Sequence, residues 1–310
     1  MPLLTVVICT YNRSFILGEC LDSLVTQTVP VEKFEILVVD NNSTDGTQKI
    51  ATEFCNGIPN AHVISEPTQG LSYARNRGLK EAKSEWVAFI DDDAKASPQW
   101  VSSILKTIKA GDFDCFGGPY RAWHRFGPPP AWFSSDWENS ISIHQSHYGP
   151  MVAGNYPTGG TCAMHRELAL LLGGFPTDVG MSGDKCAYGE ETALFQKMLQ
   201  YGMRIGYVPE MVIDHCVLPY KYSLVWRLKS AYAHGRDDLG NKEHIPSTGR
   251  EKGLYFFFEF CKEVAWRIPK RLVNSVRQKY RWQRMILECF TPLMTLFGKV
   301  RATLYEVKKR

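Results

Sequence analysis

The chain of 310 residues lacks several signatures that assign a protein quickly. No GxGxxG segment follows its first strand-like stretch and no GxxxxGKS/T segment occurs, which disfavours dinucleotide and P-loop sites. Its nine cysteines include no CxxC pair, which argues against a zinc ribbon and for reduced cytosolic thiols instead of a disulfide framework. Charges and a proline interrupt every apolar run before about 18 residues, so no transmembrane helix is expected.

Acidic and basic residues are unevenly distributed along the chain. Residues 1–218 contain 16 Lys and Arg against 24 Asp and Glu, a net charge of −8, whereas residues 219–310 contain 20 against 8, a net charge of +12. The basic segment raises the possibility of nucleic-acid binding, but no recognised nucleic-acid motif is present and the acidic body would repel a phosphate backbone. We therefore expect no nucleic-acid partner.

Strand-like and helical patterns alternate along the first part of the chain, which is typical of a mostly parallel sheet covered by helices. The pattern is irregular from 120 to 157, resumes, and gives way to amphipathic helices after Pro219. We predict an α/β domain over 1–218, with a ligand-binding half at 1–119 and a second half at 120–218. A basic, aromatic-rich helical extension over 219–310 follows. The expected strands are Thr5–Cys9, Phe34–Val39, Ala61–Ser65, Trp86–Ile90, Phe113–Gly117, Thr158–Met164, Arg204–Val208 and Met211–His215.

Three consecutive carboxylates, Asp91 to Asp93, directly follow the apolar stretch Trp86–Ile90. Residues two apart in extended backbone face the same way, so Asp91 and Asp93 could converge on one cation while Asp92 points elsewhere. Hard oxygen ligands suit Mg or Mn, which usually bind together with phosphates. The alternative is an acidic turn, because Asp often follows strands.

Polar residues also follow the other early strands. The carboxyl ends of parallel strands meet at one edge of a sheet, where ligands bind. That edge would hold an aromatic ring, an Asp that accepts from a base N–H, an Arg for a phosphate, and the carboxylates. These groups fit a nucleoside diphosphate with a divalent cation. The segments concerned are Thr10–Arg13, Asp40–Gly46 and Gln69–Asn76.

Six motifs in a fixed order resemble those of the family 2 glycosyltransferases, which have the GT-A fold. The resemblance covers about residues 4–218, and it implies a Rossmann-like sheet with helices on both faces. Single motifs of this kind are weak, but their order makes the match specific. They are Val6–Arg13, Val38–Thr47, Gly70–Asn76, Phe89–Asp93, Thr158–Met164 with Gly173–Phe175, and Gly189–Leu194.

The resemblance also implies roles for individual residues. Thr10, Tyr11 and Asp40 would contact the nucleoside, with Asp40 accepting from the base. Arg75 would lie beside the nucleotide or its phosphates. Asp91 and Asp93 match the DxD motif, in which the last Asp binds the metal and the first reaches the ribose or the metal. We also assign Arg13 and Asp92 to the donor site, with Asp92 as the structural member of the cluster.

The pair Glu190-Glu191 is expected to open a helix. Acidic side chains in the first turn of a helix interact favourably with the helix dipole, and this structural role alone explains many such pairs. The family usually carries Glu-Asp here, and the second acid is the catalytic base. The resemblance therefore implies Glu191 as the base, with Glu190 as the second candidate for that role. His215 closes a later strand, where similar transferases place a third metal ligand, and imidazole suits Mn-like ions.

The resemblance thus predicts an inverting glycosyltransferase. It would use Mn or Mg and move a sugar from a UDP- or GDP-linked donor to a hydroxyl of a glycan or glycolipid, in bacterial surface polysaccharide or glycolipid synthesis. A catalytically silent nucleotide-sugar binding or scaffold protein is the alternative. The basic, aromatic extension suits binding to an anionic membrane surface. The other interpretation is that its helices only cover the fold and expose a basic face to solvent. We expect a cytoplasmic protein, peripheral on the inner face of the cytoplasmic membrane if the extension binds lipid.

Overall fold

The computed structural model describes residues 2–134, 145–183, 186–237 and 249–309. The chain divides into two compact units. The first, which we call the sheet unit, comprises the described residues within Met1–Trp123, Glu138–Gly183 and Glu190–Cys216. The second, the helical unit, comprises those within His124–Trp137, Asp184–Gly189 and Val217–Arg310.

The sheet unit is built on an eight-stranded sheet with the order β3-β2-β1-β4-β9-β6-β10-β8. The first four strands in this order run parallel, β9 is antiparallel to both of its neighbours, and β6 and β10 are parallel. Every residue of β2 is buried, as expected of a strand covered on both faces. The strands are β1 (Leu4–Thr10), β2 (Glu35–Asp40), β3 (Ala61–Ser65), β4 (Trp86–Asp91), β6 (Cys115–Gly117), β8 (Gly149–Pro150), β9 (Thr161–His165) and β10 (Ile205–Tyr207).

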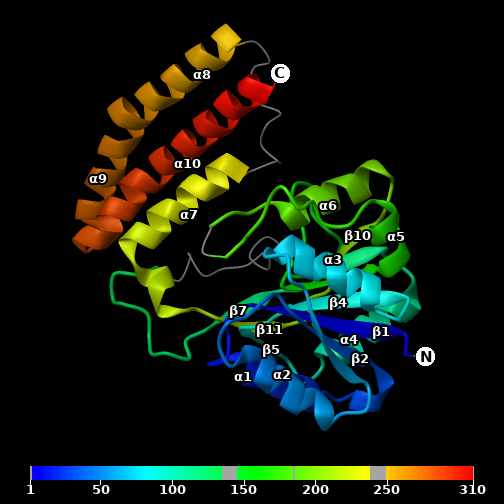
Figure 1. Ribbon diagram of the computed structural model, residues 1–310. Coiled ribbons are helices and arrows are strands. Elements are labelled where there is room, and N and C mark those ends of the chain that lie inside the picture. Colours follow the sequence, from blue (N-terminus) through cyan, green and yellow to red (C-terminus); the bar gives the residue numbers. More distant parts are fainter. Residues whose placement is uncertain (1, 135–144, 184–185, 238–248, 310) are drawn as a thin grey trace. The chain divides into compact units, whose positions relative to one another are not determined.

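Helices cover both faces of this sheet (Figure 1). One apolar core lies between the sheet and helices α1 (Leu17–Val25), α2 (Thr47–Asn56) and α4 (Trp100–Ala110). The other lies between the opposite face and helices α3 (Leu71–Glu81), α5 (Arg166–Leu171) and α6 (Glu190–Gln200). Alternate residues of one strand enter different cores, because successive side chains of a strand point to opposite faces. Val6 and Ile8 of β1 belong to the first core and Val7 to the second.

A second, three-stranded sheet has the order β5-β11-β7. Its strands are β5 (Ala94–Ala96), β11 (Ile213–Cys216) and β7 (Tyr120–Trp123). Strand β5 begins directly after the Asp91–Asp93 cluster and pairs antiparallel with β11, in a register that sets His215 opposite Ala94. This small sheet therefore brings the end of β11 beside the acidic cluster.

The helical unit contains four long helices, with a π-helical turn between α8 and α9. Pro269 lies in the first turn of α9 and cannot donate a hydrogen bond to the preceding turn, which gives a reason for the wider π geometry just before it. Helix α10 packs against α7, α8 and α9. No helix among the described residues is both long and apolar enough to cross a membrane. The elements are η4 (Pro219–Tyr222), α7 (Leu224–Asp237), α8 (Gly249–Lys262), η6 (Glu263–Arg267), α9 (Ile268–Arg277) and α10 (Trp282–Lys309).

A short segment before α6 also belongs to the helical unit. The ring of Tyr188 stacks on His234 of α7, with ring centroids 3.8 Å apart, and its hydroxyl lies 2.9 Å from the Ser230 Oγ. The Tyr188 N–H donates to Asp237 Oδ2 at 3.0 Å, and Arg236 donates to the carbonyl of Cys186. Four contacts with α7 therefore fix this segment within its unit.

The predicted fold class is confirmed, with a mostly parallel central sheet, helices on both faces and a helical C-terminal part. The proposed halves at 1–119 and 120–218 stay a prediction. Strands β5, β7 and β8 were not expected, because two to four residues carry too little periodicity to identify a strand. All nine cysteines are free thiols.

Candidate functional site

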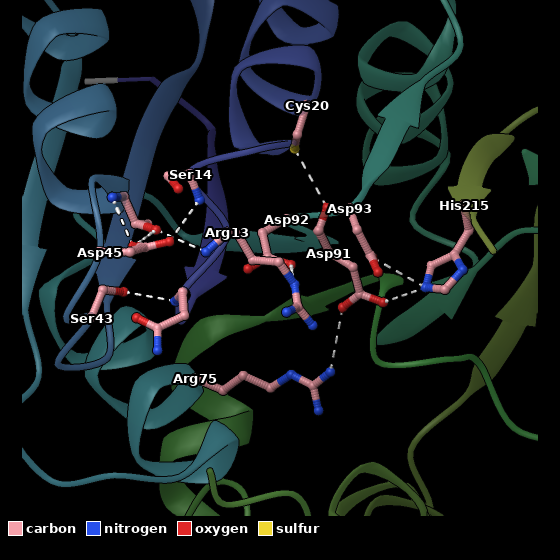
Figure 2. Close-up of polar contacts among 12 residues, drawn as sticks. Arg13, Ser14, Cys20, Ser43, Asp45, Arg75, Asp91, Asp92, Asp93 and His215 are labelled. Carbon is pink, nitrogen blue, oxygen red and sulfur yellow. Dashed lines mark hydrogen bonds and ion pairs between the residues drawn. The ribbon is translucent and has the colours of Figure 1, made fainter. Parts of the chain in front are cut away.

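The acidic cluster ends strand β4 and faces His215 across the start of the small sheet (Figure 2). The Nε2 of His215 lies 3.6 Å from Asp91 Oδ2 and 3.3 Å from Asp93 Oδ1. One ligand atom from each of the three residues can be chosen so that all lie within 4.8 Å of one another. Two carboxylates and an imidazole at that spacing suit a single Mn- or Mg-like cation.

Backbone contacts hold this trio in place. The N–H of Cys216 donates to the carbonyl of Asp93 at 2.8 Å, which ties β11 to the turn that carries the cluster. On the other side, the thiol of Cys20 on α1 donates to the carbonyl of Asp91 at 3.4 Å. The ring of Tyr120 on β7 lies against His215, with centroids 5.6 Å apart. The geometry therefore arises from three elements that are distant in sequence.

The middle member of the cluster points away from His215, as predicted, although Asp92 and Asp93 lie in a turn between β4 and β5 and not in extended backbone. Arg13 Nε lies 3.4 Å from Asp92 Oδ1 (Figure 2). Burial raises the pKa of Asp92 to about 7, against the opposing effect of the Arg13 cation. Asp92 therefore connects the end of β4 to the loop after β1, and it does not join the group around His215.

Arg75 on α3 is the central cation of the site, with a side chain only 4% exposed. Its Nη1 donates to Glu190 Oε1 at 2.9 Å and lies 3.7 Å from Glu191 Oε2, and its Nη2 lies 3.9 Å from Asp91 Oδ1. The guanidinium also lies over the ring of Phe175, 5.3 Å from its centroid. Burial alone would lower the pKa of Arg75, but the surrounding carboxylates outweigh it and raise the pKa. Arg75 thus stays charged and links the acid pair on α6 to the cluster on β4.

The two acids at the start of α6 differ in environment. The side chain of Glu190 is 4% exposed, whereas that of Glu191 is 27% exposed. Burial, with the charge of Glu191, raises the pKa of Glu190 to about 8, although Arg75 acts in the opposite direction. Glu190 therefore holds a proton more strongly than an exposed carboxyl does, and Glu191 is the member of the pair that solvent reaches.

Two glycines before β9 allow the backbone to approach these charged groups closely. A Cβ on Gly160 would collide with the carboxylate of Asp91, and a Cβ on Gly159 would collide with the guanidinium of Arg75. The N–H of Asp91 donates to the Gly160 carbonyl at 3.4 Å. Only glycine leaves room for this approach, which gives a physical reason for the Gly159-Gly160 motif.

The ends of β1 and β2 form a second part of the site. Thr10 and Asp40 are register partners and both are buried. Asp40 Oδ2 accepts from the N–H of Ser43 at 3.4 Å, while its Oδ1 is buried without a hydrogen-bond partner in the described part of the chain. A buried carboxylate oxygen without a donor is costly, so the Oδ1 of Asp40 is a ready acceptor for a ligand N–H. Tyr11, the next residue after β1, is half-buried.

Asn41 was not among the predicted site residues, yet it organises this region. Its side-chain amide donates to the carbonyls of Glu66 and Thr68, and its oxygen accepts from the N–H of Gly70. These bonds join the end of β2 to the segment that leads into α3, and so they position the helix that carries Arg75. An Asn directly after a strand was the available signal, because short polar side chains often bond to nearby backbone.

The structure brings most of the predicted site residues into contact. Asp91, Asp93 and His215 form one group, and Arg75 joins Asp91 to Glu190 and Glu191. Arg75 was predicted to lie beside the nucleotide or its phosphates; its contacts here are with carboxylates, and the nucleotide contact stays a prediction.

Comparison with known proteins gives a consistent result. The model of glycosyl transferase family 2 matches residues 5–168, which include both strand-end segments and the acidic cluster. The succinoglycan biosynthesis protein ExoM of Rhizobium meliloti is 30% identical over 248 residues, which cover 76% of this chain and 75% of that protein. A glucosyl-dolichyl phosphate glucuronosyltransferase of Haloferax volcanii is 24% identical over 81% of each chain. The glycosyltransferase AglE of Haloferax volcanii is 37% identical over 119 residues, which cover only 39% of that protein.

Among solved structures, the mannosyltransferase PcManGT of Pyrobaculum calidifontis, in complex with GDP-Man and Mn2+, superposes with a TM-score of 0.63. The likeness covers 98% of this chain and 88% of that one at 21% sequence identity, and it shows a shared fold. The solved structure shows the fold, whereas the match to the family model and the similarity to ExoM show the family. The chain belongs to glycosyl transferase family 2, and it is a glycosyltransferase with the GT-A fold.

Proposed function

We propose that this glycosyltransferase is metal-dependent and inverting, and that it moves a sugar from a UDP- or GDP-linked donor to an acceptor hydroxyl. The observation that carries the proposal is the position of Arg75. One buried guanidinium lies within 3.9 Å of a carboxylate of the Asp91, Asp93 and His215 group and within 3.7 Å of Glu191. A cation site and a candidate base are therefore neighbours, as direct displacement at an anomeric carbon requires.

Glu191 is the proposed base. It would take the proton from the acceptor hydroxyl as that oxygen attacks the anomeric carbon, and the donor's diphosphate would leave from the opposite face. Its partial exposure supports this choice, because a base must reach a substrate, whereas Glu190 is buried and hydrogen-bonded to Arg75. Glu190 would then position Arg75 and Glu191 without itself accepting the proton. No covalent intermediate with the enzyme is needed.

The divalent cation, Mn or Mg, would be held by Asp91, Asp93 and His215. Their two carboxylates and one imidazole fit such an ion, and their mutual spacing within 4.8 Å fits a shared position. When bound, the ion would stabilise negative charge on the departing diphosphate. The residues of the chain would bind and orient the donor, with Asp40 Oδ1 accepting an N–H of the base and Tyr11, Thr10 and Arg13 beside it.

For the acceptor, we propose a glycan or glycolipid in bacterial surface polysaccharide or glycolipid synthesis, in the cytoplasm or at the inner face of the cytoplasmic membrane. The names of two relatives, ExoM and the glucuronosyltransferase, support this setting. One takes part in succinoglycan biosynthesis, and the other transfers to a glucosyl-dolichyl phosphate.

A panel of UDP- and GDP-sugars tests the proposal. The purified chain is incubated with each donor, with Mn2+ or with EDTA, and free nucleoside diphosphate is measured with and without lipid and glycan acceptors. We expect release from one donor or a small group of donors, and only with the metal. Release that is equal in EDTA would refute the metal dependence. Donor binding without release for any donor and acceptor would favour the silent nucleotide-sugar binding protein.

A further inference from the structure

The α8–α9 segment of the helical unit exposes many of its large apolar side chains, although Phe256 of α8 is buried. In water, an amphipathic helix buries its apolar stripe and exposes its polar one. In α9 the buried side chain is Ser275, while Leu272, Val273 and Val276 are exposed. Helix α9 is therefore packed with its polar side inward.

The same segment contains an ion-pair cluster around one buried carboxylate. Glu263 is 5% exposed, and its two carboxylate oxygens accept from Arg267 and Arg271, each at 2.6 Å. These arginines hold the pKa of Glu263 below its usual range, although burial opposes them. Glu263 and both arginines belong to the same helical segment, so these ion pairs stabilise the segment itself.

The exposed apolar residues are large and closely spaced. In α8, Leu254, Phe257 and Phe258 are three and four residues apart, so they share one face of the helix. In the π-helical turn, Trp266 is 72% exposed. We call the following set the outer apolar residues: Leu254, Phe257, Phe258, Trp266, Val273 and Val276. Large apolar side chains exposed this close together mark an interaction site.

Cations without acidic partners follow the same segment. Lys270, Arg277, Lys279 and Arg281 are exposed, and no carboxylate of the described residues lies within ion-pair distance of them. They lie in α9 and in the turn before α10, next to Val273 and Val276 in sequence. Aromatic and aliphatic side chains bordered by unpaired Lys and Arg fit the boundary between acyl chains and anionic headgroups.

We propose that the outer apolar residues and these four cations bind the surface of an anionic lipid bilayer, with α8 and α9 lying in the plane of the interface. A second copy of the chain is the competing occupant. Self-association through this surface would bring together two segments that each carry a net charge of +12 over residues 219–310. Anionic lipid neutralises that charge, which favours the bilayer. The proposal does not depend on the reaction of the sheet unit.

Vesicle sedimentation with the full chain tests the proposal. Vesicles contain phosphatidylcholine alone or with phosphatidylglycerol, and binding is measured at low and high salt. We expect binding to the anionic vesicles that weakens with salt. The variant Phe257→Ser/Trp266→Ser and, separately, Lys270→Gln/Arg277→Gln should each reduce partitioning by about tenfold or more. The matched control Leu171→Ser/Tyr201→Ser alters two exposed apolar residues of the sheet unit and should bind like the wild type.

Light scattering after size-exclusion chromatography and the melting temperature complete the experiment. Wild type and variants should be monomers of about 35 kDa with equal melting temperatures. A dimer that the Phe257→Ser/Trp266→Ser variant converts to monomer, without vesicle binding by the wild type, would overturn the proposal in favour of self-association. Equal binding to neutral and anionic vesicles, or full binding by both surface variants, would also overturn it. None of these outcomes bears on metal-dependent donor release, which is also measured in the absence of lipid.

Discussion

Glu190 should make the stability of the sheet unit depend on pH in a specific way. Its pKa is raised from 4.5 to about 8, first by burial and then by the charge of Glu191. A carboxyl whose pKa is higher in the folded state binds more protons when folded. Its contribution to stability is therefore complete below about pH 4.5 and is lost as the pH rises through about 8. The loss amounts to roughly 4 kcal/mol at pH 8.

The variant Glu190→Gln removes this dependence, because the amide has nearly the same shape and does not titrate. Melting temperatures of wild type and Glu190→Gln are compared from about pH 5 to about pH 8 in EDTA, so that no cation alters the local charge. The variant should gain on the wild type as the pH rises, by roughly 10 °C across the range for a unit of this size. The control Glu167→Gln changes an exposed acid in the first turn of α5 and should show no such trend. A difference between Glu190→Gln and wild type that does not vary with pH would refute the reasoning.

Two further predictions concern the cation site. His215→Ala should weaken Mn2+ binding, measured by titration calorimetry, by about tenfold or more. The control His62→Ala removes a half-exposed histidine beside Glu35 and should leave Mn2+ affinity unchanged. Unchanged affinity in His215→Ala would show that His215 is not a metal ligand. Gly160→Ala should abolish Mn2+ binding and lower the melting temperature, because its Cβ collides with the Asp91 carboxylate, whereas Gly18→Ala, where a Cβ meets nothing within 4 Å, should do neither. Wild-type Mn2+ affinity in Gly160→Ala would show that the close approach of β9 is not required.

The sequence predicted the strand ends well because local patterns and the order of motifs carry that information. The apolar runs of β1 and β4 identified the strands, and parallel strands bring Thr10, Asp40 and Asp91 to one edge. Asp91 and Asp93 were also predicted as a pair apart from Asp92; the pairing is found, but the turn after β4 produces it, and not the extended backbone that was assumed. These elements need no knowledge of distant packing.

Other features depend on tertiary packing and could not be predicted. Strand β5 is three residues long, and only its pairing with β11 shows why His215 faces the cluster. The contacts of Arg75 with Glu190 and Glu191 join residues 115 or more positions apart, which no local pattern records. The orientation of α9 is a further case. Its amphipathic pattern was visible, but the usual expectation that the apolar side faces inward is wrong for this helix, in which Ser275 is buried while Leu272, Val273 and Val276 are exposed.

Transfer rate and donor affinity, measured side by side for wild type and Glu191→Gln with Mn2+ and the donor found in the panel, decide whether Glu191 is the base. The amide keeps the size of the side chain but cannot accept the proton. We expect donor affinity to be unchanged and the transfer rate to fall by about 10²–10⁴-fold, while Glu167→Gln keeps both. Near wild-type transfer by Glu191→Gln would contradict the assignment of Glu191 as the base in this site.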